Sequence, residues 1–113
     1  MTTMPQAIMV LTNLPDLEAA RRLARSVVEQ KLAACVNIWP GVQSVYRWQG
    51  AVEEATEWAL SIKTTPNRYA ELELAIKRQH PYAVPEIIAL PIVAGSREYL
   101  NWIADETNKD VNA

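Results

Sequence analysis

The chain has 113 residues, of which 50% are hydrophobic and 21% are charged, and this is the composition of one ordinary globular domain. Its formal net charge of -2 argues against binding to nucleic acid or to an anionic membrane surface. No apolar run approaches the ~18 residues that span a bilayer, and residues 1–5 lack the features of a signal peptide. A single cysteine, Cys35, excludes an intrachain disulfide, so we expect a cytoplasmic protein.

The N-terminal part of the chain predicts a buried strand followed by an amphipathic helix. Residues 7–11 form a short apolar run that is typical of a buried strand. Pro15 suits the first helical position, and Asp16 and Glu18 place negative charge at the positive end of the helix dipole. Apolar residues then recur at helical spacing, which predicts a helix that ends near Lys31.

A long hairpin is predicted in the middle of the chain. Residues 34–49 are rich in β-branched and aromatic side chains, and the Pro40-Gly41 pair among them predicts a bulge or a bend. Gln49-Gly50 predicts a tight turn. Residues 51–64 fit two patterns, because their alanines and glutamates favour a helix whereas the alternation after Trp58 favours a strand. We choose the strand.

The next helix has clear signals at both ends. Thr65 suits a helix cap and Pro66 suits the first helical position that follows it. The helix should stop at His80, because Pro81 disfavours helical geometry in the residue before it.

The C-terminal part predicts an edge strand and a short helix. Residues 86–93 form an apolar strand, in which Pro91 lacks a backbone donor and therefore indicates an edge position or a strand end. Ser96 suits the cap of a last helix. The polar residues 107–113 should fray.

These elements predict an α+β fold, in the order β-α-β-β-α-β with a C-terminal helix, which is the ferredoxin-like arrangement with an antiparallel sheet. We expect one domain over residues 1–113, ordered at about residues 7–106. Two hairpin arms of ~14 residues would span roughly 45 Å, whereas a domain of this size has a radius of gyration of about 13 Å. The tip, with Tyr46 and Trp48, should therefore project and need cover from another subunit of a symmetric oligomer.

Five segments, in this order along the chain, resemble those of the CutA family of divalent-cation tolerance proteins. They are KLAACVN (31–37), YRWQG (46–50), IKT (62–64), HPYAVPEI (80–87) and YLNW (99–102). The resemblance implies a tight homotrimer whose hairpins cross to neighbouring subunits, which makes Tyr46 and Trp48 candidate anchors. Trp58 is a further candidate for packing or for the interface. The resemblance also implies a link to copper and other divalent metals, and no enzymatic reaction.

Metal-ligand residue types are sparse, and the candidate ligands are Cys35, His80 and Glu86. A thiolate binds soft ions such as Cu(I) or Zn(II), and neutral imidazole suits copper or zinc. Cys35 and His80 match no metal-spacing signature, so a site would also need Glu86 or a carboxylate from another subunit. Ala83 stands where the family often has an acidic residue. Candidates for the pocket or the outer shell are Lys63, Tyr82 and Asn37.

Each candidate ligand also has a structural interpretation that the sequence leaves open. Cys35 fits a buried small hydrophobic residue. His80 fits a helix C-terminal residue bonded to the last carbonyls, and Glu86 fits a solvated strand end. An acidic cluster lacks the spacing of a calcium loop and is interpreted as an exposed face: Glu53, Glu54 and Glu57.

We therefore expect a cytoplasmic homotrimer that binds divalent metal, copper first and zinc as another candidate, at clefts between subunits. The alternative is a trimeric signalling or scaffold module that binds a small effector or a partner protein, as nitrogen-regulatory PII-like proteins do; this analogy rests on fold alone. An enzyme with a Cys35-His80 pair is the weakest hypothesis. The chain has no Gly-rich phosphate loop and no Gly-x-Ser-x-Gly motif.

Overall fold

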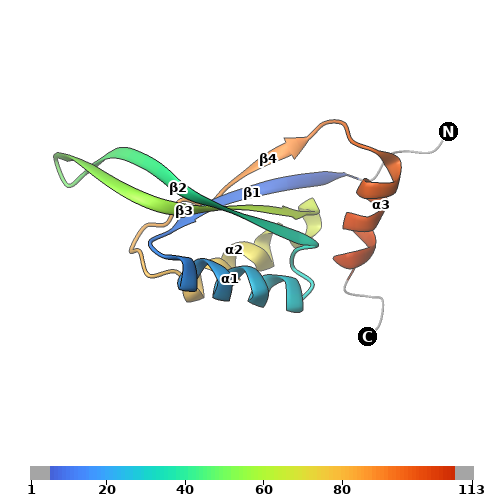
Figure 1. The fold of residues 1–113 in the computed structure, drawn as a ribbon. Coiled ribbons are helices and arrows are strands. Elements are labelled where there is room, and N and C mark those ends of the chain that lie inside the picture. Colours follow the sequence, from blue (N-terminus) through green and yellow to red (C-terminus); the bar gives the residue numbers. More distant parts are fainter. Residues whose placement is uncertain (1–5, 109–113) are drawn as a thin grey trace.

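A computed structural model describes residues 6–108 of the chain, and its elements follow the predicted order (Figure 1). They are β1 (Ala7–Leu14), α1 (Leu17–Glu29), β2 (Cys35–Trp48), β3 (Ala51–Thr64), the 3₁₀ helix η1 (Pro66–Arg68), α2 (Tyr69–Gln79), β4 (Ile88–Ile92) and α3 (Arg97–Glu106). The strand interpretation of residues 51–64 is confirmed. The expectations about residues 1–5 and 109–113 lie outside the described residues.

The four strands form one antiparallel sheet in the order β2-β3-β1-β4. Helices α1 and α2 cover one face of this sheet and leave the other face free of helices along most of its length (Figure 1). The predicted ferredoxin-like fold is thus confirmed. Strand β4 is an edge strand, which explains why Pro91 is tolerated in it.

The main core lies between the sheet and helices α1 and α2. Alternate residues of β1 point toward the helices, and Val10 there is paired with Ile62 of β3. Both side chains are fully buried and pack with Leu23 of α1 and Ile76 of α2. Burial of one such side chain stabilises the fold by about 1.5–3 kcal/mol, so this two-layer packing holds the sheet in register.

The helix ends are set by local signals, with two changes from the prediction. Thr65 precedes the 3₁₀ helix η1 instead of α2, and its side chain makes no cap hydrogen bond. Asp16, rather than a residue before Pro15, is the cap of α1, because its carboxylate accepts a hydrogen bond from the Ala19 backbone N–H at 2.8 Å. Pro15 therefore lies before the helix instead of at its first position. The predicted end of α2 at His80 and the predicted cap at Ser96 are confirmed.

The hairpin of β2 and β3 is as long as predicted, with 14 residues in each arm. The predicted bulge lies between Trp39 and Val42, where Gly41 has a φ of 68°. Gln49 and Gly50 have φ values of 49° and 83°, so both central residues of the turn are left-handed, as a type I′ turn requires. The tip projects beyond the helices, and the molecule measures 52 × 28 × 22 Å (Figure 1).

Helix α3 forms a smaller cluster at the end of the sheet opposite the hairpin tip (Figure 1). Leu100 and Ile103 of this helix pack there with Ala7 and Ala34. The predicted fraying is wrong at Thr107, which is buried and whose hydroxyl donates to the Ile103 carbonyl at 2.8 Å. Across residues 6–108, no helix combines the length and the apolar character that crossing a membrane requires.

Candidate functional site

The helix-free face of the sheet carries a continuous row of apolar side chains. Met9 and Leu11 of β1 are paired with Leu90 and Ile88 of β4, so these four residues share that face. Trp39 of β2 lies on the same face, and it is 57% exposed, while Ile88 is 50% and Leu90 is 40% exposed. Contiguous exposed apolar surface of this kind marks an interaction face. We call it the open face.

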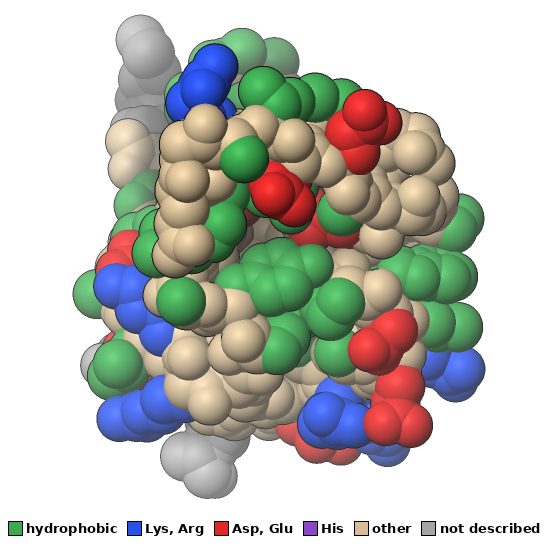
Figure 2. Space-filling view, turned by 90° about the vertical axis from the view of Figure 1, so that its left-hand side faces the viewer, with side chains coloured by type: hydrophobic (Ala, Val, Ile, Leu, Met, Phe, Trp, Pro, Cys, Tyr) green, Lys and Arg blue, Asp and Glu red, His purple; other side chains and the backbone are tan. Residues whose placement is uncertain are grey.

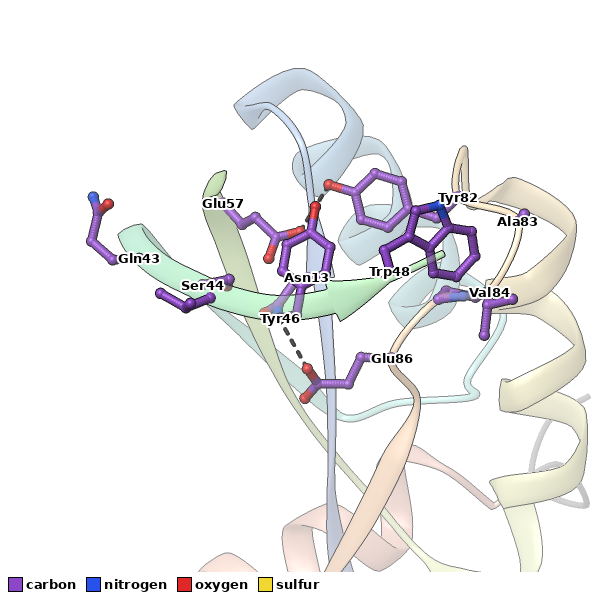
Figure 3. Close-up of a pocket in the computed structure, with 12 residues that line it drawn as sticks. Asn13, Gln43, Ser44, Tyr46, Trp48, Glu57, Tyr82, Ala83, Val84 and Glu86 are labelled. Atoms are coloured by element: carbon purple, nitrogen blue, oxygen red, sulfur yellow. Dashed lines mark hydrogen bonds between the residues drawn. The ribbon is translucent and has the colours of Figure 1, made fainter. Parts of the chain in front are cut away.

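A pocket of about 820 Å³ lies where the hairpin leaves the core. Its walls come from the end of β1, the projecting parts of β2 and β3, and the loop between α2 and β4 (Figure 3). Figure 2 looks toward the hairpin tip and shows acidic and hydrophobic side chains around a hollow on this side. The lining residues are Asn13, Gln43, Ser44, Val45, Tyr46, Trp48, Glu57, Tyr82, Ala83, Val84, Pro85 and Glu86.

Glu57 is buried in the wall of this pocket, with only 7% of its surface exposed. The Tyr82 hydroxyl donates a hydrogen bond to Glu57 Oε2 at 2.8 Å (Figure 3). Burial and this hydrogen bond raise the pKa of Tyr82. The interpretation of the acidic cluster as an exposed face is therefore wrong for Glu57, although Glu53 and Glu54 are exposed. Glu57 is buried because the α2–β4 loop lies over it, which no local pattern reveals.

Asn13, at the end of β1, connects two of the candidate ligands. Its side-chain amide donates to Glu86 Oε1 at 3.1 Å, and its backbone carbonyl accepts a hydrogen bond of 2.7 Å from His80 Nε2. Because a carbonyl can only accept, Nε2 of His80 carries the proton. His80 Nδ1 then accepts from the Tyr82 backbone N–H at 3.2 Å. His80 and Glu86 are thus brought to the same strand end.

Both ring nitrogens of His80 are consequently engaged within the chain. Burial lowers the pKa of His80, and this favours the neutral ring that the two hydrogen bonds require. A metal would need a nitrogen lone pair, and the lone pair of Nδ1 is used by Tyr82. In the single chain, His80 therefore joins the end of α2 to β1 and the following loop.

Cys35 lies at the other end of the sheet from His80 and Glu86. It is paired with Lys63 of β3, which is paired with Met9, four residues before Asn13 in β1. At about 3.4 Å per residue, this offset amounts to roughly 14 Å along the strand. Within residues 6–108, no three or more His, Cys, Asp or Glu side chains form a group that could hold a metal ion. The predicted ligand trio does not meet in one chain.

The remaining candidates divide between the same two ends of the sheet. Lys63 donates to the Asn37 side-chain oxygen close to Cys35, away from the pocket. Tyr82 lies in the pocket, as do the predicted interface residues Tyr46 and Trp48.

The third predicted interface residue, Trp58, lies on the other side of the sheet. Its partner Leu14 belongs to the buried core, and the Trp58 side chain packs against that core beneath the helices. It is half-buried there, so within the chain its role is packing.

Three residues of these sites were not singled out from the sequence as functional: Asn13, Trp39 and Glu57. For Trp39 the sequence held a signal, because strand alternation places this residue beside the small residues of β3. In the structure its indole N–H donates to Ser61 Oγ across the open face at 2.9 Å. For Asn13 and Glu57 no local signal existed, because their partners are more than 20 positions away in the chain.

The fold is that of a small ferredoxin-like domain with one open sheet face and a pocket beside its hairpin. The sequence model of the family described as "CutA1 divalent ion tolerance protein" matches residues 8–106. The chain belongs to this family, as its sequence motifs predicted.

Several proteins are similar to this chain over most of its length. The "Divalent-cation tolerance protein CutA" of Thermus thermophilus is 52% identical over 98 residues, which cover 87% of this chain and 95% of that protein. The solved structure of CutA1 from Oryza sativa superposes with a TM-score of 0.90 at 44% identity, covering 96% of this chain and 99% of that one. "Protein CutA, chloroplastic" of Arabidopsis thaliana is 47% identical over 101 residues, which cover 89% of this chain and 56% of that protein.

Proposed function

We propose that this chain acts in divalent-cation tolerance as a homotrimer that binds divalent cations, copper first, at clefts between its subunits. The observation that carries the proposal is the separation of the candidate ligands. Cys35 lies at one end of the sheet, and His80 and Glu86 lie at the other. Only a second chain can bring the two groups together.

The open face and the hairpin support the assembly part of this proposal. Trp39, Ile88 and Leu90 leave a large apolar surface in water in a single chain. The projecting tip exposes Tyr46 and Trp48 as well. Burial of apolar area stabilises association by about 25 cal/mol per Å² before the entropic costs of binding, and further copies of the chain are the simplest source of cover.

The chemistry of the donors sets the proposed order of metals. Cys35 offers a thiolate, and a site with nitrogen, oxygen and sulfur donors binds Cu(II) most strongly among the divalent first-row ions, ahead of Zn(II). Asn13 occupies Oε1 of Glu86, which leaves the other carboxylate oxygen to face a cation. His80 can join only if its Nδ1 gives up the bond from the Tyr82 N–H. We therefore place Cys35 and Glu86 at the centre of the proposed site and His80 beside it.

Native mass spectrometry and calorimetric titration with copper test the two parts separately. The intact protein should have the mass of three chains, and Cys35→Ser should bind copper at least tenfold more weakly than the parent protein. His80→Ala should have the smaller effect. Glu54→Gln, an exposed charge change outside the pocket, is the matched control. A monomer at working concentration, or unchanged copper affinity in both ligand variants, contradicts the proposal.

The pocket beneath the hairpin favours a second candidate function, a signalling or scaffold module that binds a small effector. Its volume of about 820 Å³ suits small-molecule ligands, whose pockets measure about 300–1,000 Å³. In that case a metabolite should raise the unfolding temperature in the presence of a metal chelator. Stabilisation by copper alone would favour the first function.

We propose no enzymatic reaction and a cytoplasmic location for this chain. Relatives are named for other compartments, since the Arabidopsis thaliana protein is called chloroplastic and an Archaeoglobus fulgidus structure is called periplasmic. Fractionation of the cells that make the protein tests the location.

A further inference from the structure

Two charged side chains of the sheet lack an opposite charge within their own chain. Glu57 is only 7% exposed, and its hydrogen-bond partner is the neutral Tyr82 hydroxyl. Lys63 is half-buried, and it donates to the neutral side chain of Asn37. The ion pairs formed within residues 6–108 all involve other side chains. Charged groups are almost never buried unless they are paired, so both should find partners in the assembled protein.

These two charges lie at opposite ends of the open face. Lys63 is paired with Met9, and Glu57 lies six positions earlier in β3, so strand alternation puts both side chains on the face of Met9. At about 3.4 Å per residue, they are separated by roughly 20 Å. Among the open-face positions of the described strands, Lys63 is the only Lys or Arg. The other carboxylate of these positions, Glu53, is exposed to water near the hairpin tip.

The geometry points to a head-to-tail contact between open faces, and we propose that Lys63 of each subunit forms an ion pair with Glu57 of the next subunit. This inference rests on the proposed homotrimer and adds to it which end of one face meets which end of the next. A contact that joins unlike ends closes into a ring when the rotation fits, as in a trimer.

The charges select this direction, which the apolar surface alone leaves open. Trp39, Ile88 and Leu90 supply apolar area, but this attraction is not directional. A contact between like ends would place Glu57 beside Glu57 and Lys63 beside Lys63, and like charges in contact suppress such an arrangement. Contact between unlike ends cancels both charges at once.

The surroundings of Glu57 fit a lysine that arrives from outside the chain. Figure 3 shows the Tyr46 ring beside the Glu57 carboxylate, with Tyr82 and Trp48 adjacent. A lysine side chain can pack its apolar stem on such rings while its ammonium group reaches the carboxylate. Because an ammonium group has three donors, Lys63 can keep its bond to Asn37 as well.

The same register agrees with the proposed metal site. Cys35 is the cross-strand neighbour of Lys63, and Glu86 lines the same pocket as Glu57. An ion pair between Lys63 and Glu57 of the next subunit therefore brings Cys35 of one subunit toward Glu86 of the other. The pair itself needs no metal, so it can be tested in the presence of a chelator.

A double-mutant cycle with neutral variants tests the pair. Glu57→Gln and Lys63→Gln each leave the opposite charge without its partner, so each should speed dissociation of the trimer at least about tenfold. The double variant should dissociate no more than about twofold faster than the faster single variant. Exchange of subunits between unlabelled and isotope-labelled trimers, followed by native mass spectrometry, measures these rates. Sites roughly 20 Å apart act independently within one chain, so coupling of this size shows a contact between chains.

Glu54→Gln is the matched control, because Glu54 is an exposed glutamate of the same strand on the opposite face. It should exchange at the rate of the parent protein and should leave the effect of Lys63→Gln unchanged. Effects of Glu57→Gln and Lys63→Gln that multiply, to about a hundredfold in the double variant, overturn the proposed pair. Single variants that exchange like the parent protein overturn it as well.

Charge reversal provides a second test. Glu57→Lys and Lys63→Glu each bring like charges together and should lower the trimer fraction, whereas the chain that carries both changes should regain it. A doubly reversed chain that is folded by circular dichroism but stays dissociated overturns the pair, and if a reversed variant does not fold, the neutral cycle decides. A parent protein with the mass of one or two chains contradicts the homotrimer and this register together. A trimer without coupling overturns the register alone.

Discussion

Thr12 of β1 is expected to destabilise the fold through its hydroxyl group. The side chain is fully buried on the helix-covered face of the sheet, where its residue is paired with Leu60 of β3. Among the described residues its Oγ1 has no hydrogen-bond partner. Thr12→Val replaces this hydroxyl with a methyl group of similar size and keeps the β-branched shape that strands favour.

The size of the effect follows from the cost of burying an unpaired polar group. A buried hydroxyl without a partner costs about 1–3 kcal/mol, so Thr12→Val should raise the free energy of unfolding by about 1–2 kcal/mol. In a domain of about this length, each 1 kcal/mol corresponds to a shift of about 4 °C in the unfolding temperature. The apolar contacts of the new methyl group act in the same direction.

Thr64 of β3 is the matched control, because it is equally buried but its hydroxyl donates to the Leu32 carbonyl at 2.7 Å. Thr64→Val should therefore lower the free energy of unfolding by about 1–2 kcal/mol. Urea unfolding at one fixed protein concentration measures both variants, and unchanged m-values would show that the unfolded states are comparable. If Thr12→Val destabilises the protein as much as Thr64→Val does, the Thr12 hydroxyl is satisfied in the folded protein and the reasoning fails.

Three smaller predictions concern single groups. Burial lowers the pKa of His80 below 6.5 in the folded state. The contribution of His80 to stability is therefore present above pH 6.5 and is lost as the pH falls toward the folded pKa. Urea unfolding above and below pH 6.5 should show this loss in the parent protein and a smaller loss in His80→Gln. Gly50→Ala should lower the free energy of unfolding by about 1–2 kcal/mol in the same assay, because φ is 83° at this position. The added methyl group would contact nothing that could offset this cost. An unchanged urea midpoint would contradict the left-handed turn. Asp16→Ala should cost about 1 kcal/mol by removing the cap bond to Ala19, and Asp16→Asn should restore most of it.

Local signals in the sequence were enough to place most of the helices and strands and to identify the family, although residues 51–64 fitted two patterns. The left-handed Gly41 and Gly50, the cap at Ser96 and the end of α2 before Pro81 depend on neighbours within a few positions. Such interactions are formed by the backbone of the residue itself and by side chains one turn away, so they can be recognised in the linear chain. The length of the hairpin likewise followed from counting strand residues.

The residues of the pocket depend on contacts between distant parts of the chain. Glu57 looked like part of an exposed acidic face, yet the loop that carries Tyr82 covers it. Asn13 drew no attention, yet it bonds both His80 and Glu86. A side chain's burial and partners are set by whichever segment packs on it, and the strength of a buried hydrogen bond depends on that packing.

The same distinction applies to the ligands proposed for metal. Residue type alone identified Cys35, His80 and Glu86, because soft and borderline metals select thiolate, imidazole and carboxylate donors. The strand register places Cys35 far from His80 and Glu86 within one chain. Hydrogen bonds with Asn13 and Tyr82 engage both ring nitrogens of His80. Donor chemistry is a property of each residue, whereas distance and free lone pairs arise only when the strands are aligned and the loops are packed.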